Sequence, residues 1–344
     1  MSKVVNTKTG SQDIMESKDD IKVSVICITY NHEKFLRECL DSMVCQKTNF
    51  PFEIVIHDDK STDSTIDIIK EYKKNYPNLI VPIFEEENQY SKGKSIIEEC
   101  AIPYAKGKYV AICEGDDRWC DENKLQKQYD FMESHPDYVA CFHNTILHDL
   151  NNKIPDRNFN NFKKTIDLSS SILFKNRYVH TSSYFVKKEC YKKLDFGKNL
   201  WFGDFVILTS LFAYGKLAIL PQLMSIYNNN NLNGVMKSKI EKSIKSQIDS
   251  ALIEIKYLED YNLYFKGKYN REIKDRISYI YVYNIYDNKL LLSKDNKEYR
   301  QIKKELLKSD YYKNFMKQSD FKAKIKSFIK YHLPRKIFIR FRGK

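Results

Sequence analysis

The stretch VSVICITYN, from Val23 to Asn31, decides the fold. Its first six residues form a continuous run rich in β-branched side chains, and a polar tripeptide ends it. Two later stretches have the same form: EIVIHDDKSTDST from Glu53 to Thr65, and GKYVAICEGDDRW from Gly107 to Trp119. Uninterrupted apolar runs of this kind are typical of strands that are buried on both faces of a parallel sheet.

Helical patterns follow these strands. Apolar residues recur at helical spacing after the first two runs, and a helix is expected from Ser95 to Ala105. The predicted strands are Val23–Ile28, Glu53–Ile56, Leu79–Phe84 and Tyr109–Cys113. Alternation of strands and helices predicts an α/β fold with a Rossmann-like sheet flanked by helices. Shorter strand-like pieces at Tyr138–His143 and Ser182–Val186 favour a mixed sheet.

Polar side chains stand at three of the predicted strand ends. The clusters are Thr29/Tyr30/Asn31, Asp58/Asp59 and Glu114/Asp116/Asp117. Ligands of open α/β sheets bind at the carboxyl ends of the strands, so the three clusters are expected to line one crevice. An aromatic ring and several carboxylates would then share a single rim.

The carboxylates at these ends have two interpretations. Asp116 and Asp117 suit Mg²⁺ or Mn²⁺, which prefer one or two carboxylates together with phosphate oxygens and waters. They also suit the acidic first turn of a helix. Asp58 and Asp59 are equally ordinary turn residues. Tyr30 either stacks on a nucleobase or belongs to the core.

The three stretches, in this order and at this spacing, resemble the family 2 glycosyltransferases of the GT-A fold, and are closest to bacterial members that assemble surface polysaccharides. The resemblance covers roughly residues 23–235. It implies a nucleotide-diphosphate sugar donor, most often a UDP-sugar, an Mn²⁺ or Mg²⁺ ion, and transfer with inversion. The implied acceptor is a saccharide or a lipid-linked saccharide.

The resemblance also assigns roles to residues. Tyr30 would stack on the base and Asp59 would accept a hydrogen bond from it, with Asp58 supporting their loop. Asp116 would lie near the ribose and the metal, and Asp117 or Asp116 would ligate the ion. The family often has Asp where this chain has Glu114, so Glu114 ranks as the weakest metal ligand. The donor-binding set is Thr29, Tyr30, Asn31, Asp58, Asp59, Lys94 and Asp116. Lys94 either holds a phosphate or belongs to a solvated basic loop.

A general base is expected after the acceptor-facing strands. The resemblance points to Asp204, in WFGDFVILTSLF, although Asp204 would serve equally as a helix cap before Phe205 and Leu208. The expected acceptor side consists of His180, Thr181, Ser182 and Trp119. His180 is alternatively a structural histidine. The family often closes a basic loop over the diphosphate, whereas this chain has an asparagine run, Asn228–Asn231, which is expected to be a mobile loop.

Composition suggests four regions. Residues 1–20 read as a disordered polar tail, 21–235 as the catalytic domain, 236–315 as a small helical domain and 316–344 as a basic tail. Eight cysteines without a CxxC pair favour a reducing cytoplasm and argue against a zinc site built from cysteine pairs. No signal peptide or membrane span is predicted.

The last region carries much of the net charge of +13: it holds ten Lys/Arg and a single acid, Asp320. Apolar residues are interleaved with the basic ones, a pattern typical of an amphipathic segment on an anionic membrane surface. The expected location is therefore cytoplasmic, with peripheral attachment to the inner face of the cell membrane. The alternative is a helix that packs on the protein body. An oligomer is compatible with the sequence.

Other classes of protein fit less well. A basic nucleic-acid-binding protein would not place carboxylate clusters against phosphates, so no nucleic-acid partner is expected. A Rossmann oxidoreductase or an NTPase would need GxGxxG or GxxxxGK[ST], and neither is present. A catalytically inactive protein that binds nucleotide sugars stays open, because Glu114 and Gly203 depart from the family pattern.

Overall fold

A computed structural model describes residues 20–151, 153–175, 179–192, 203–229, 244–332 and 334. Contacts divide these residues into two compact units. The first contains the described residues between 20 and 169, 179 and 192, and 203 and 229. The second contains 170–175 and the residues from 244 onward.

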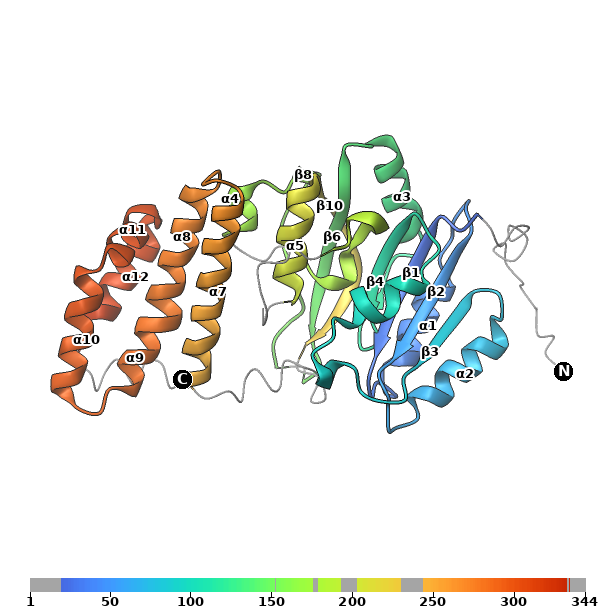
Figure 1. The fold of residues 1–344 in the computed structure, drawn as a ribbon, viewed down its shortest axis with the longest axis horizontal. Coiled ribbons are helices and arrows are strands. Elements are labelled where there is room, and N and C mark those ends of the chain that lie inside the picture. Colours follow the sequence, from blue (N-terminus) through green and yellow to red (C-terminus); the bar gives the residue numbers. More distant parts are fainter. Residues whose placement is uncertain are drawn as a thin grey trace. The chain divides into compact units, whose positions relative to one another are not determined.

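A mixed sheet forms the centre of the first unit, as the strand pattern predicts (Figure 1). Its strand order is β3-β2-β1-β4-β9-β6-β10-β5, with β7 beside β6 and β8 beside β10. The first four strands in that order are parallel to one another, and β9 runs antiparallel to both β4 and β6. The strands are β1 Val23–Thr29, β2 Phe52–Asp58, β3 Ile80–Phe84, β4 Tyr109–Glu114, β5 Arg118–Trp119, β6 Tyr138–Asp149, β7 Arg157–Asn158, β8 Ile166–Asp167, β9 Phe185–Lys187 and β10 Lys216–Asn229.

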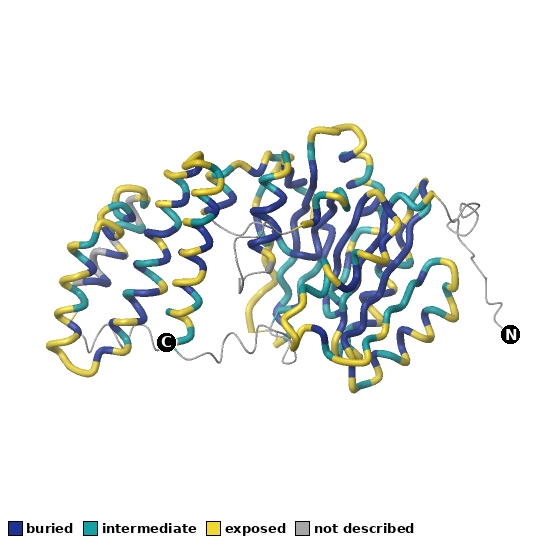
Figure 2. The backbone as a smooth tube through the Cα atoms, viewed as in Figure 1, coloured by how far each residue is buried: buried dark blue, intermediate teal, exposed yellow. Residues whose placement is uncertain are grey.

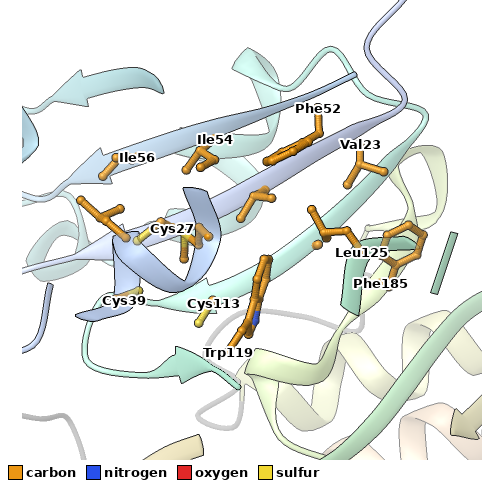
Figure 3. Close-up of a cluster of buried hydrophobic side chains, with 14 of the residues drawn as sticks. Val23, Cys27, Cys39, Phe52, Ile54, Ile56, Cys113, Trp119, Leu125 and Phe185 are labelled. Carbon is orange, nitrogen blue, oxygen red and sulfur yellow. The ribbon is translucent and has the colours of Figure 1, made fainter. Parts of the chain in front are cut away.

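Helices cover the sheet because their apolar residues recur on one side. In α1 (Leu36–Val44) the buried residues are Leu36, Cys39, Leu40 and Met43, the i, i+3, i+4, i+7 pattern of an amphipathic helix. Figure 3 shows Cys39 of this helix beside Cys27 and Cys113, which come from β1 and β4. The other helices of the unit are α2 Thr65–Asn75, α3 Lys124–Ser134 and α5 Gly203–Tyr214, with short helices η1 Tyr90–Lys92, η2 Ile96–Ala101, η3 Ile102–Tyr104, η4 Thr181–Ser183 and η5 Lys188–Cys190.

Two predicted elements differ from the structure. The expected helix over 95–105 is a π-helix, η2, followed by a 3₁₀ turn, η3. Pro103 explains the break, because it has no N–H to continue the helical ladder. The expected strand over 182–186 begins only at Phe185, since the preceding residues form η4.

The second unit is helical. Its larger core gathers Val282, Leu290, Tyr299, Leu306, Tyr312, Phe315 and Tyr331, all buried. Figure 2 shows buried residues recurring along one side of its helices and exposed residues along the other. The helices are α4 Ser170–Leu173, α7 Ile244–Tyr264, α8 Asn270–Ile280, η6 Tyr281–Tyr286, α9 Asp287–Leu292, α10 Asn296–Lys308, α11 Asp310–Gln318 and α12 Phe321–His332.

Much of the predicted basic tail is part of this unit. In α12, Ser327 and Tyr331 are fully buried, and the Tyr331 hydroxyl donates to Asp287 Oδ1 at 2.8 Å. Lys330 forms a buried ion pair with the same Asp287. The expected boundary at residue 316 is therefore wrong for the described part of the chain: α12 packs on neighbouring helices, and residues 335–344 lie outside the described residues, as do 1–19.

In the described residues, no helix combines the length and the apolar character that crossing a membrane requires.

We expect Gly107→Ala to destabilise the first unit. A Cβ at position 107 would lie 2.5 Å from the Ser24 backbone nitrogen and 2.7 Å from the Val23 carbonyl carbon, and backbone cannot move aside as a side chain can. Overpacking of this kind lowers the free energy of unfolding by about 1–3 kcal/mol. Gly215→Ala is the control, because its Cβ would meet the Val139 side chain. Urea denaturation of both variants checks this; equal losses would contradict it.

Candidate active site

The first part of the candidate site is the end of β1. Asn31 has a left-handed backbone, with φ of 57°, and its side-chain Oδ1 accepts the Thr62 N–H at 2.7 Å. Its own N–H donates to Ser61 Oγ at 2.9 Å. These bonds tie the end of β1 to the loop after β2 and leave the Tyr30 side chain outside the core, with 44% of its surface exposed. The core alternative for Tyr30 is thus excluded, and its ring is available for stacking.

Asp58 has an internal structural role. It is fully buried at the end of β2 and accepts hydrogen bonds from the Ser61 N–H, at 2.9 Å, and from the Ser61 hydroxyl. Burial raises the pKa of Asp58, and the two bonds from Ser61 oppose that shift. Asp58 therefore holds the turn that carries its neighbour Asp59.

Asp59 holds a second loop. Its carboxylate accepts the Gln89 N–H at 2.6 Å and the Tyr90 N–H at 3.1 Å, one on each oxygen. The Asn88 amide donates to the Asp59 carbonyl at 3.1 Å. Each carboxylate oxygen has a second lone pair, so Asp59 can accept one further bond from a base. Lys94 lies on the same loop, and its side chain is exposed.

The acidic cluster gathers where β4 ends. Glu114, Asp116 and Asp117 each offer a carboxylate oxygen within 4.8 Å of the others. Gly115 allows this close turn, because a Cβ there would lie 2.9 Å from His32 Nδ1 and 3.0 Å from the Thr29 side chain. Glu114, the weakest of the predicted ligands, is thus as close to the cluster as the other two.

Asp117 is the buried member of the cluster, with 1% of its surface exposed. Its Oδ1 accepts the Asn228 N–H at 3.1 Å, whereas the buried Oδ2 has no hydrogen-bond partner. Burial, followed by the charges of Asp116 and Glu114, raises the pKa of Asp117 well above its ordinary value. An orphaned carboxylate oxygen beside two further carboxylates fits a divalent cation, which would supply the missing positive charge.

His180 stands next to Asp117. Its Nδ1 is 3.6 Å from Asp117 Oδ2, beyond hydrogen-bond distance, and lies 2.9 Å from Ser182 Oγ and 3.3 Å from the Ser182 N–H nitrogen. Burial lowers the pKa of His180 to about 4, against the charges of Asp204 and Asp116, so the ring is neutral at pH 7. It stacks on Tyr227, with 4.1 Å between the ring centroids.

Three of the expected acceptor-side residues lie in the core. Trp119 is 4% exposed and donates its indole N–H to the Ser182 carbonyl at 3.1 Å, while Ser182 is fully buried and Thr181 is 6% exposed. Lys124 Nζ lies 4.1 Å from the centre of the Trp119 ring and closes the space beneath it. Because so little of these side chains is exposed, their observed role is internal: Trp119 holds the segment that carries His180 through its bond to Ser182.

Asp204 is the second residue of α5, and its side chain is exposed. It lies within electrostatic range of the acidic cluster, as the Tyr227 hydroxyl shows. The pKa of Tyr227 is raised first by burial and then by four carboxylates, those of Asp117, Glu114, Asp116 and Asp204. The charges of the predicted base and of the predicted metal ligands thus all contribute to the raised pKa of Tyr227.

Sequence reasoning missed two residues of this site. Asn228 is 4% exposed and belongs to β10; its amide donates to the Asp116 carbonyl at 2.7 Å. The expectation of a mobile loop is therefore wrong for Asn228 and Asn229, because these bonds hold the strand end against the acidic cluster. Residues 230 and 231 lie outside the described residues. The second missed residue is His32, whose Nε2 is 3.8 Å from Asp116 Oδ2. It directly follows the first motif, which ends at Asn31, and was therefore not considered with it.

The family follows from this geometry and from comparison. Residues 24–194 match the family model described as Glycosyl transferase family 2. The chain belongs to this family, as its three motifs predict.

Two of the curated relatives are named as glucosyltransferases. An uncharacterized protein of Mycobacterium tuberculosis is 33% identical over 60% of this chain and 59% of its own length. The poly(ribitol-phosphate) beta-glucosyltransferase of Bacillus spizizenii is 38% identical over 33% of this chain and 17% of its own length. WfaP of Escherichia coli, a UDP-Glc:alpha-D-GlcNAc-diphosphoundecaprenol beta-1,3-glucosyltransferase, is 38% identical over 33% and 41% respectively. The matches span less than two thirds of these relatives.

A solved structure agrees in fold. S. aureus TarS 1–349, in complex with UDP-GlcNAc, superposes with a TM-score of 0.61, covering 94% of this chain and 92% of that one. Sequence identity is 18%, so the likeness concerns the fold alone, which is the GT-A type that the motifs predict.

We expect Asp117→Asn to stabilise the metal-free protein and to abolish metal binding. A carboxyl whose pKa is raised in the folded state destabilises the fold once pH exceeds its unfolded pKa of about 3.9, and the full penalty is present above the raised value. At pH 7 in EDTA the variant should therefore be more stable than the wild type and unfold at a higher temperature.

Thermal denaturation with EDTA and with Mn²⁺ measures both effects. The wild type should be stabilised by Mn²⁺ and the variant should not. A variant that is less stable in EDTA, yet still stabilised by Mn²⁺, would contradict the assignment of Asp117. Asp121→Asn, outside the cluster, is the control.

Proposed function

We propose that this chain transfers a sugar, with inversion, from a nucleotide-diphosphate sugar to a hydroxyl of a saccharide or lipid-linked saccharide, in the synthesis of a surface polysaccharide. The observation that carries the proposal is the acidic cluster where β4 ends: Glu114, Asp116 and Asp117 bring carboxylate oxygens within 4.8 Å of one another, and the buried Asp117 Oδ2 has no hydrogen-bond partner. The match to the Glycosyl transferase family 2 model supports sugar transfer at this cluster. WfaP, named for a UDP-Glc donor and a diphosphoundecaprenol acceptor, supports a UDP-sugar and a lipid-linked acceptor.

The nucleotide end consists of Tyr30 and Asp59. Tyr30 offers an exposed ring to the base, and Asp59, fixed by the Gln89 and Tyr90 N–H groups, offers a free lone pair to a base N–H. A uracil imide N–H fits this acceptor. Thr29 and Asn31 flank Tyr30 at this end of the site. Thr29 Oγ1 is buried without a hydrogen-bond partner, and Asn31 Oδ1 holds the turn by accepting the Thr62 N–H. Lys94 is exposed, and it would contact a phosphate of the donor only if its loop closed over the site.

The metal end consists of Asp116 and Asp117, with Glu114 beside them. When bound there, Mg²⁺ or Mn²⁺ offsets the negative charge that develops on the leaving nucleoside diphosphate. Asn228 keeps the two aspartates in place through its contacts with the Asp117 side chain and the Asp116 carbonyl.

Asp204 acts as the general base of the proposed reaction. Its exposed carboxylate takes the proton from the acceptor hydroxyl as that oxygen attacks the anomeric carbon. His180 is neutral because burial lowers its pKa to about 4, and its ring stacks on Tyr227. Because it is uncharged, it does not offset the negative charge of Asp204 or of the acidic cluster.

We expect Asp204→Asn to lower the rate of sugar transfer by about 10²–10⁴-fold, the usual contribution of a general base, with little change in donor binding. Transfer from a panel of UDP-sugars to the acceptor and UDP-induced thermal stabilisation measure the two effects separately. Asp67→Asn, at a position with 83% of its side chain exposed on α2, is the control.

Full transfer by Asp204→Asn would exclude it as the base. Transfer that EDTA leaves unchanged would exclude the metal. A protein that binds UDP-sugars but transfers none with any acceptor offered would instead be an inactive donor-binding protein.

The residues after Pro334 carry the proposal of peripheral attachment to the inner face of the membrane. They include five basic residues, Arg335, Lys336, Arg340, Arg342 and Lys344, among four large apolar ones. Each basic residue contributes about 1 kcal/mol near an anionic surface. The helix α12 is excluded from this role where its residues pack in the second unit.

We expect a chain that ends at Pro334 to bind anionic phosphatidylglycerol vesicles at least about tenfold more weakly than the full chain. Co-sedimentation with these vesicles and with neutral phosphatidylcholine vesicles measures the difference. Because the truncation spares Lys330 and Tyr331, the second unit should keep its unfolding midpoint. Equal binding by both chains would disprove the attachment.

A further inference from the structure

A second group of metal-ligating side chains lies at the start of residues 85–90, the nucleotide loop, whose Gln89 and Tyr90 N–H groups hold Asp59. His57 comes from β2, Glu85 follows β3, and Cys100 belongs to the π-helix η2. Each offers one ligand atom, and the three atoms lie within 4.8 Å of one another. The group shares no residue with Glu114, Asp116 and Asp117, which are the other such cluster in the described part of the chain.

The spacing of the group suits a tetrahedral ion. His57 Nε2 lies 3.1 Å from Glu85 Oε1. Two ligands at about 2.0–2.1 Å from a tetrahedral zinc ion are separated by about 3.3 Å, so a small displacement of either side chain admits the ion between them. A thiolate at about 2.3 Å completes a three-ligand set with one position left for water.

Burial and charge favour a cation there. His57 is fully buried and Cys100 is 6% exposed, whereas the Glu85 side chain is 24% exposed and leaves a path for an ion. Burial raises the pKa of the Cys100 thiol, and the negative charges of Glu85, Glu99 and Asp59 raise it further, against the single positive charge of Lys94. Positive charge is therefore stabilised at this point.

The donor atoms identify the ion. Imidazole nitrogen and thiolate sulfur prefer zinc and other borderline or soft cations, whereas Mg²⁺ and Mn²⁺ prefer oxygen donors such as the acidic cluster provides. We propose that His57, Glu85 and Cys100 form a zinc-binding site, separate from the active-site metal, that fastens the nucleotide loop to the sheet.

The remaining imidazole nitrogen sets the strength of this site. His57 Nδ1 is buried and has no hydrogen-bond partner. Ligating histidines almost always donate their second N–H to an acceptor, and loss of that support costs about 10–100-fold in metal affinity. This site is therefore expected to bind zinc more weakly than one whose histidine donates its second N–H.

The position of the site couples it to the donor. His57 directly precedes Asp58 and Asp59, and the Glu85 N–H donates to the Asp58 carbonyl at 3.1 Å. From Glu85 the chain runs to Gln89 and Tyr90, whose N–H groups hold Asp59. Zinc would join both ends of this loop to η2 and so fix the acceptor that faces the base. This coupling rests on the proposed function, whereas zinc binding itself does not.

The test uses the metal-stripped full chain, in excess Mg²⁺ to occupy the acidic cluster, titrated with Co²⁺ and then with Zn²⁺. One equivalent of Co²⁺ should produce a thiolate-to-cobalt charge-transfer band, which Zn²⁺ removes. Cys100→Ser should lack the band and bind Zn²⁺ at least tenfold more weakly in competition with a chelator, and Glu85→Gln should weaken both. Circular dichroism verifies that the variants are folded.

Cys120→Ser, which removes an exposed thiol near the acidic cluster, should keep the band, and so should Asp117→Asn. A band that persists in Cys100→Ser, or disappears in Cys120→Ser, would overturn the zinc site. UDP affinity with and without Zn²⁺ tests the coupling: a change of at least threefold is expected in the wild type and none in Cys100→Ser. An unchanged affinity would overturn the coupling. Absence of UDP binding would instead count against the proposed function, because the cobalt band does not depend on it.

Discussion

Strand register is the constraint on which the site depends. β1 pairs with β2 so that Thr29 lies opposite Asp58, and with β4 so that Ile28 lies opposite Glu114. The three strands consequently end at one level, and their polar residues meet at a single edge. A slip of one residue in β4 would turn its buried side chains to the opposite face, at the cost of the core, so the apolar residues of the strands also fix the acidic cluster.

Sequence patterns predicted those parts of this arrangement that depend on residues close together in the chain. The strands and the meeting of their ends follow from apolar runs and from topology alone. The position of Asn228 could not be predicted in this way, because its partners Asp116 and Asp117 are more than a hundred residues away in the chain. Trp119 and Ser182 were expected on the acceptor side, and the sequence did not reveal their burial for the same reason: only the packing of η4 against β5 and α3 shows it.

The amphipathic pattern of α12 shows a second limit of sequence reasoning. Interleaved basic and apolar residues look the same whether the apolar side faces lipid or protein. Whether the apolar side of α12 faces lipid or protein depends on Asp287, which is buried at the start of α9 and needs a positive charge to offset its own negative charge. Lys330 supplies that charge from more than forty residues away, a pairing that no periodicity in either segment reveals. Charge counted along the chain therefore overestimates the charge available at a surface.

The way in which Asp59 is held affects how freely the neighbouring loop can vary. Gln89 and Tyr90 bind Asp59 through backbone N–H groups, which every residue except proline possesses. Their side chains take no part in that contact, and Tyr90 is 60% exposed. Substitutions along this loop can therefore change the side chains exposed beside Asp59 without removing the backbone bonds that hold its carboxylate. A fold with this division can vary the chemistry of that surface by single substitutions while Asp59 keeps its position.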